Sequence, residues 1–166
     1  MKAHEIYAAV AHETVKEMLD WFRAQDRKVY RTAIAALAGP RKLRPVFIEK
    51  KPMPDQYLWL HKTLAQKQSN SVGEQLLQGW LMGGQQEMLA AFCDAVGIEH
   101  DGKGTVSGDI PESFDADKLK AAVDALLTKH SPALVSIYLH CFNLQREDGW
   151  PEITAVIAGD DRLKLG

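Results

Sequence analysis

The stretch SPALVSIYLHCFNLQ, residues 131–145, decides the fold class. Ser131 followed by Pro132 is typical of a helix start, because Ser caps free backbone N–H groups and Pro fits the first helical position. Beyond them, apolar side chains occupy every side of the predicted helix instead of a single stripe. A helix without a polar face is normally central and buried. We therefore predict a buried helix over about 132–145.

Helical spacing continues outward from this segment in both directions. Apolar residues three and four apart recur almost throughout, and the strict alternation of strands is nearly absent. Further helices are predicted over about 3–24, then to 38, and over 55–66, 71–84 and 85–96, with two more starting near 115 and 151. The fold class predicted is all-α: one compact bundle of seven or eight helices arranged as stacked helical hairpins.

Four prolines fall within residues 40–54 and mark a candidate hinge. The residue before a proline favours extended backbone, so we expect no helix there but an extended strap with residues 46–48 part-buried. Residues 1–166 are predicted to form a single helical domain. Within it, an N-terminal helical arm (1–39) is joined by the basic connection 40–54 to a helical core (55–166).

Composition excludes several classes of protein. The chain is 46% hydrophobic and 25% charged, which is too apolar for a disordered chain, and two cysteines are too few for a disulfide framework. No apolar stretch approaches the roughly 18 residues that span a bilayer, so no membrane partner is expected. Cys93 and Cys141 lie in apolar runs, as free thiols do, and a reducing, cytoplasmic location is expected.

Charge is distributed unevenly along the chain. Residues 1–67 carry 13 Lys and Arg against 7 Asp and Glu, whereas residues 68–166 carry 7 against 15. The basic excess is concentrated in segment 23–51, which predicts a surface for an anionic ligand or a partner. Its candidate residues are Arg27, Arg31, Arg41, Lys42 and Arg44. The interpretation favoured over an anion site is that these residues face the acidic part of the same chain or of a second copy.

No known catalytic or metal-binding motif is present. His12 and Glu13 begin like a zinc-protease motif, but Lys16 stands where the second His is required. The loop 99–109 contains His100 and Asp101 among glycines, and its spacing does not fit a calcium loop. The sequence therefore predicts no catalytic residue, no metal ligand and no cofactor, with a tight turn favoured over a ligand site in that loop.

Three hypotheses of function follow. The preferred one is a cytosolic helical module for protein interaction or assembly, without catalytic activity, whose partner is another protein or a second copy. The second is a protein that binds nucleic acid or another anion through segment 23–51, which the net charge of −2 disfavours. The third is an enzyme that lacks a recognisable motif.

Overall fold

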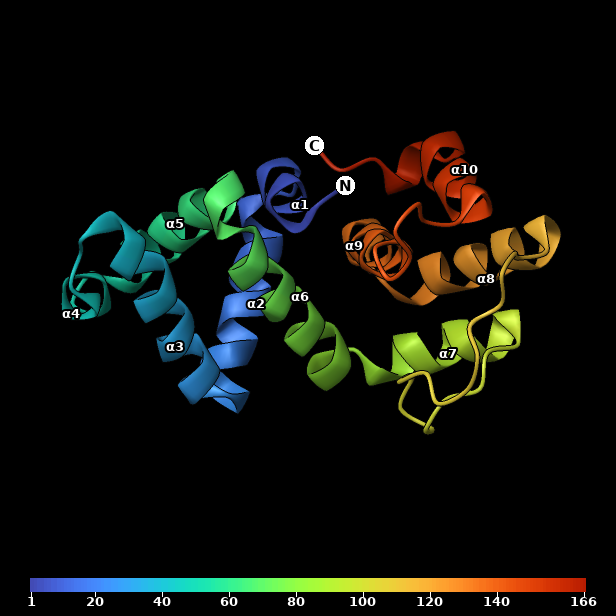
Figure 1. The fold of residues 1–166 in the computed structure, drawn as a ribbon, viewed down its shortest axis with the longest axis horizontal. Coiled ribbons are helices and arrows are strands. Elements are labelled where there is room, and N and C mark those ends of the chain that lie inside the picture. Colours follow the sequence, from blue (N-terminus) through green and yellow to red (C-terminus); the bar gives the residue numbers. More distant parts are fainter. The chain divides into compact units, whose positions relative to one another are not determined.

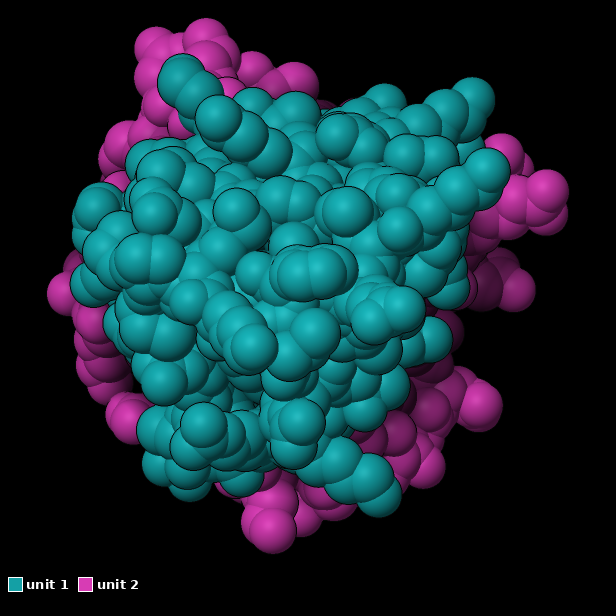
Figure 2. Space-filling view, turned by 90° about the vertical axis from the view of Figure 1, so that its left-hand side faces the viewer, with its two compact units in different colours: residues 1–80, 166 teal, residues 81–165 magenta.

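The computed structural model describes all residues, 1–166, and confirms an all-α fold with ten α-helices, three short 3-10 helices and no strand. His100 and Val106 form one isolated bridge. The chain divides into two compact units, residues 1–80 with Gly166, and residues 81–165 (Figures 1 and 2). None of the helices combines the length and apolarity required to cross a membrane.

The first unit is built from helices α1 to α6. In Figure 1, α2 and α3 lie side by side as a hairpin, and α5 packs on α1, α2 and α3. The core includes Ile6, Phe22, Ile34, Leu37 and Leu60, each at most 2% exposed. The helices are α1 (Ala3–Ala9), α2 (His12–Gln25), α3 (Arg27–Ala38), α4 (Pro45–Glu49), α5 (Met53–Leu64) and α6 (Asn70–Gly84), with 3-10 helices at Gly39–Arg41 and Lys67–Ser69.

The prediction of one continuous helix over 3–24 was wrong. Val10 and Ala11 adopt extended backbone between α1 and α2. The break lets α1 pack on α5 while α2 pairs with both α3 and α5. Neither residue is a helix breaker, and apolar spacing continues on both sides, so the sequence pattern holds no sign of the change in direction.

The prediction of an extended strap over 40–54 was also wrong. This segment contains most of the 3-10 helix Gly39–Arg41, all of α4 and the start of α5. Pro40 and Pro45 lie in the first turn of their helices, where the fixed φ of proline is tolerated and no N–H is missed. Together with the break after α1, α4 raises the number of α-helices from the predicted seven or eight to ten.

The second unit stacks its helices in chain order. It comprises α7 (Gln86–Val96), α8 (Ala116–Lys129), α9 (Pro132–Asn143), α10 (Pro151–Gly159) and a 3-10 helix at Asp161–Leu163, preceded by the last residues of α6. Helix α8 packs on both α7 and α9, and α10 packs on α8 and α9. The predicted start of α9 is confirmed: the Ser131 side chain accepts a hydrogen bond from the Leu134 N–H at 3.3 Å.

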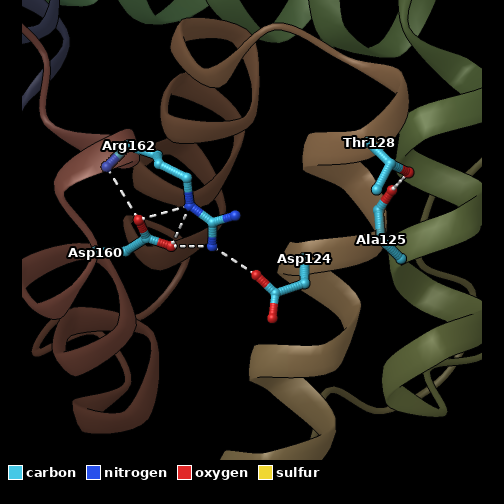
Figure 3. A network of polar contacts seen from close by, with 5 residues as sticks. All are labelled: Asp124, Ala125, Thr128, Asp160 and Arg162. Atoms are coloured by element: carbon cyan, nitrogen blue, oxygen red, sulfur yellow. Dashed lines mark hydrogen bonds and ion pairs between the residues drawn. The ribbon is translucent and has the colours of Figure 1, made fainter.

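The buried face of α9 anchors an aromatic cluster. Phe142 is 2% exposed, and its ring centroid lies 5.4 Å from that of Phe92 and 5.3 Å from that of Trp150. At the surface, Arg162 ties the C-terminal segment to α8 (Figure 3). Its guanidinium lies between the carboxylates of Asp124 and Asp160, with N–O distances of 2.5 and 2.6 Å.

Candidate partner-binding surface

An open groove lies between α3 and α4 in the first unit. Its volume is about 580 Å³, and it brings together two residues of the predicted basic surface, Arg27 and Arg31. They are four residues apart on α3 and therefore share one face of that helix. The remaining lining residues are Lys28, Thr32, Ala35, Pro45 and Glu49.

The positive charge of this groove is only partly neutralised. The Arg31 Nε donates to Glu49 Oε1 at 3.1 Å, across the groove from α3 to α4. Arg27 and Lys28 are exposed and have no carboxylate within ion-pair distance. Two unpaired cations therefore flank a single salt bridge. The whole first unit carries 13 Lys and Arg against 8 Asp and Glu.

Arg41 serves a different purpose from Arg27 and Arg31. It donates to the Leu37 carbonyl at 2.7 Å, to Gln66 Oε1 at 2.6 Å and to Ser69 Oγ at 3.1 Å. Leu37 lies in the last turn of α3, where carbonyls lack helical donors, so Arg41 closes that end of the helix. Three of its five N–H donors are committed within the fold.

The other two predicted residues are exposed but do not line the groove. Lys42 follows the 3-10 helix with φ of 56°, and Arg44 precedes the first residue of α4. Of the five candidate residues, the structure thus brings together Arg27 and Arg31 in the groove and leaves Arg41, Lys42 and Arg44 outside its lining.

A buried polar network fixes α4 in place. Gln56 of α5 is 3% exposed, accepts a hydrogen bond from the Tyr30 hydroxyl of α3, and donates to the Ile48 carbonyl of α4 at 3.0 Å. The Ile48 side chain is also buried, at 2% exposure. Because buried polar groups are costly when unpaired, this network holds the short helix on α3 and α5 in one position.

An exposed apolar surface on and just before α4 was not predicted from the sequence pattern. Phe47 is 61% exposed, Val46 43% and Leu43, just before the helix, 39%. An extended strap would place residues 46 and 48 on one side, whereas residues two apart on a helix diverge by about 200°. Ile48 is therefore buried while both Val46 and Phe47 are exposed. Elsewhere, exposed large apolar side chains such as Leu58, Met82 and Leu144 occur singly.

The loop after α7 holds its own histidine in a structural role. His100 Nδ1 accepts from the N–H groups of Gly102 and Gly104, at 3.1 and 3.2 Å. Its Nε2 therefore carries the proton and donates to Asp94 Oδ1 at 2.8 Å. Both ring nitrogens are occupied, and Asp101 likewise accepts from the Lys103 and Thr105 N–H groups. The contacts build a tight turn.

The nearby Cys93 lacks the properties of a nucleophile. Its side chain is fully buried, its Sγ lies 3.8 Å from the Gly104 carbonyl, and burial raises the pKa of the thiol. A raised pKa disfavours the thiolate, which is the reactive form. No cluster of three or more His, Cys, Asp or Glu side chains is arranged to hold a metal ion.

Comparison with known proteins leaves the surface as the basis for assigning function. No family model, no curated protein and no solved structure matches the chain. What the surface can bind must therefore be inferred from its charge and its exposed apolar groups.

Proposed function

We propose that this chain is a protein-interaction module that binds an acidic, apolar segment of another protein on the surface formed by α3 and α4. The observation that carries the proposal is the exposure of Phe47. A 61% exposed aromatic side chain beside exposed Val46 and Leu43 costs hydration free energy unless a partner covers it. Aromatic side chains of this kind commonly anchor protein interfaces.

The charges of the groove, whose lining includes Pro45 and Glu49 of α4 and not Phe47, specify the chemistry of the partner. Arg27 and Lys28 offer unpaired cations at the groove, and Arg31 adds a third that Glu49 already contacts. Charge complementarity selects an acidic partner and accelerates its association. A segment whose carboxylates contact the groove and whose large apolar side chain reaches around the short helix α4 to Phe47 would meet both parts of this surface.

Nucleic acid is less well supported as the ligand. Affinity for a duplex depends on many free Lys and Arg contacts to phosphate. Here three of the five N–H donors of Arg41 are used within the fold, and Arg31 is paired with Glu49. The exposed apolar side chains of α4 would also have no counterpart on a phosphate backbone.

The proposal is tested by fluorescence anisotropy of the full chain with three labelled peptides. One carries Glu together with Leu and Phe at helical spacing, the second replaces Glu by Lys, and the third keeps Glu but replaces the apolar residues by Ser. We expect saturable binding of the first alone, weakening with salt. Phe47→Ala should lower its affinity about tenfold or more, as loss of an interface anchor does. Leu144→Ala, an exposed apolar residue of the second unit, is the matched control.

Other outcomes would overturn the proposal. Equal binding of the acidic and basic peptides, or an affinity unchanged in Phe47→Ala, would show that this surface does not select the partner. Preferential binding to duplex DNA or to anionic vesicles would assign the groove to those ligands instead. Concentration-dependent dimerisation that Phe47→Ala abolishes would identify a second copy as the occupant.

A further inference from the structure

Two histidines meet in the first unit, away from the groove. His12 is the first residue of α2, and His61 lies in the last turn of α5. Their Nδ1 atoms are 3.0 Å apart, and the rings are nearly parallel, with centroids 5.3 Å apart and an interplanar angle of 13°. Both side chains are half-buried, so solvent reaches the pair.

The break between α1 and α2 fixes the protonation of His61. In an uninterrupted helix the Tyr7 carbonyl would accept from the N–H of Ala11, but α1 ends at Ala9. His61 Nε2 lies 2.8 Å from that carbonyl instead. A carbonyl can only accept, so Nε2 carries the proton, and the lone pair of Nδ1 points toward His12.

This is the arrangement in which proteins hold a metal-binding imidazole. Such a histidine donates its second ring N–H to a carbonyl or carboxylate, which sets its tautomer and orientation. Burial lowers the pKa of His61, which favours the neutral form that a metal requires. Without metal, the Nδ1–H of His12 must donate to the lone pair of His61 Nδ1. In the other neutral tautomer of His12 the proton is on Nε2, so His12 Nδ1 also presents a lone pair to the space between the two rings.

The geometry points to a divalent transition-metal site formed by His12 and His61. Nitrogens bound to Zn²⁺ at 2.0–2.1 Å in tetrahedral geometry are about 3.3 Å apart, so the two Nδ1 atoms need to separate by a few tenths of an ångström. In the structure the Nδ1 atoms face each other directly, so each ring must also turn by roughly 35° to direct its lone pair at an ion beside the line between them. Imidazole nitrogens favour Zn²⁺, Cu²⁺ and Ni²⁺ over Mg²⁺ and Ca²⁺. Water completes the coordination, which makes the ion exchangeable. The bound ion links α2, which carries His12, to α5, which carries His61.

The test is calorimetric titration of the full chain with Zn²⁺ alone at pH 7.5. We expect one ion per chain, with Mg²⁺ giving no signal. His12→Gln should weaken Zn²⁺ binding more than about tenfold, because even the loss of a residue that only hydrogen-bonds to a metal ligand lowers metal affinity by about tenfold or more. His12→Gln leaves the contact between His61 and Tyr7 intact, so it tests the site without removing that support for the fold. His130→Gln, a histidine of the second unit, is the control for loss of an imidazole.

A spectroscopic readout separates this site from binding elsewhere on the surface. In ¹⁵N-labelled protein, Zn²⁺ should shift the Nδ1 resonances of both His12 and His61 and leave the Nε2 proton of His61 in place. Saturating Zn²⁺ should also raise the melting temperature of the wild type and not that of His12→Gln. An unchanged Zn²⁺ affinity in His12→Gln, or no Zn²⁺ binding by the wild type, would show that the pair only shares a proton.

Discussion

Two neighbouring glycines of the loop after α7 allow backbone strain to be separated from steric overlap. Gly102 and Gly104 have almost the same positive φ, 87° and 84°. A Cβ on Gly102 would meet nothing within 4 Å, whereas a Cβ on Gly104 would lie 2.2 Å from Leu89 Cβ and 2.5 Å from the Ala90 nitrogen. The second contact is with the backbone of α7, which cannot rotate away.

The two alanine variants should therefore differ in stability. Left-handed backbone costs a residue with a Cβ about 1–2 kcal/mol, which applies to both positions. Overpacking adds about 1–3 kcal/mol at Gly104 alone, so Gly104→Ala should cost about 2–5 kcal/mol and Gly102→Ala about 1–2 kcal/mol. Urea denaturation at pH 7 measures both.

Hydrogen exchange supplies the structural part of the same test. In Gly104→Ala the loop must move off α7, so the backbone amides at positions 104 and 105 should lose protection from hydrogen exchange. Equal free energies of unfolding in the two variants would refute the reasoning, because it would mean that the loop does not lie against α7 as described.

Three further outcomes are expected. Phe142→Ala, within the aromatic cluster, should cost about 3–5 kcal/mol in urea denaturation, whereas Phe47→Ala should stay within about 0.5 kcal/mol of wild type, since only the first side chain is buried. Burial lowers the pKa of His140 from its usual 6.5 to about 4. Between these values the unfolded chain binds a proton at His140 that the folded chain does not, so stability should fall as the pH drops from about 6.5 to about 4. The fall should be less than about 1.4 kcal/mol per pH unit, because solvent partly screens the ring. The variant His140→Gln should flatten this pH dependence. Arg162→Ala should lower the melting temperature slightly at low salt and not at 1 M NaCl, as expected for exposed ion pairs; an equal loss at high salt would point to packing of the Arg162 side chain instead.

Part of the candidate surface could be predicted from the sequence. Arg27 and Arg31 are four residues apart in a predicted helix, and this spacing alone places them on one face. The hydrogen bonds that commit Arg41 to Leu37, Gln66 and Ser69 reach up to 28 residues along the chain. Periodicity reports which side of a helix is apolar, and it contains no information about such distant partners.

The sequence by itself determined the helical class, the start of α9 at Ser131 and Pro132, and its burial, because capping and apolar spacing are local properties. Tertiary structure decided the break at Val10 and Ala11, beside which the Tyr7 carbonyl accepts a hydrogen bond from His61 of α5. It also decided that Phe47 stays in solvent while Ile48 is buried, since the position of α4 depends on contacts with α3 and α5. These features depend on contacts between groups far apart in the chain. Such contacts stabilise the fold only once the helices have packed together.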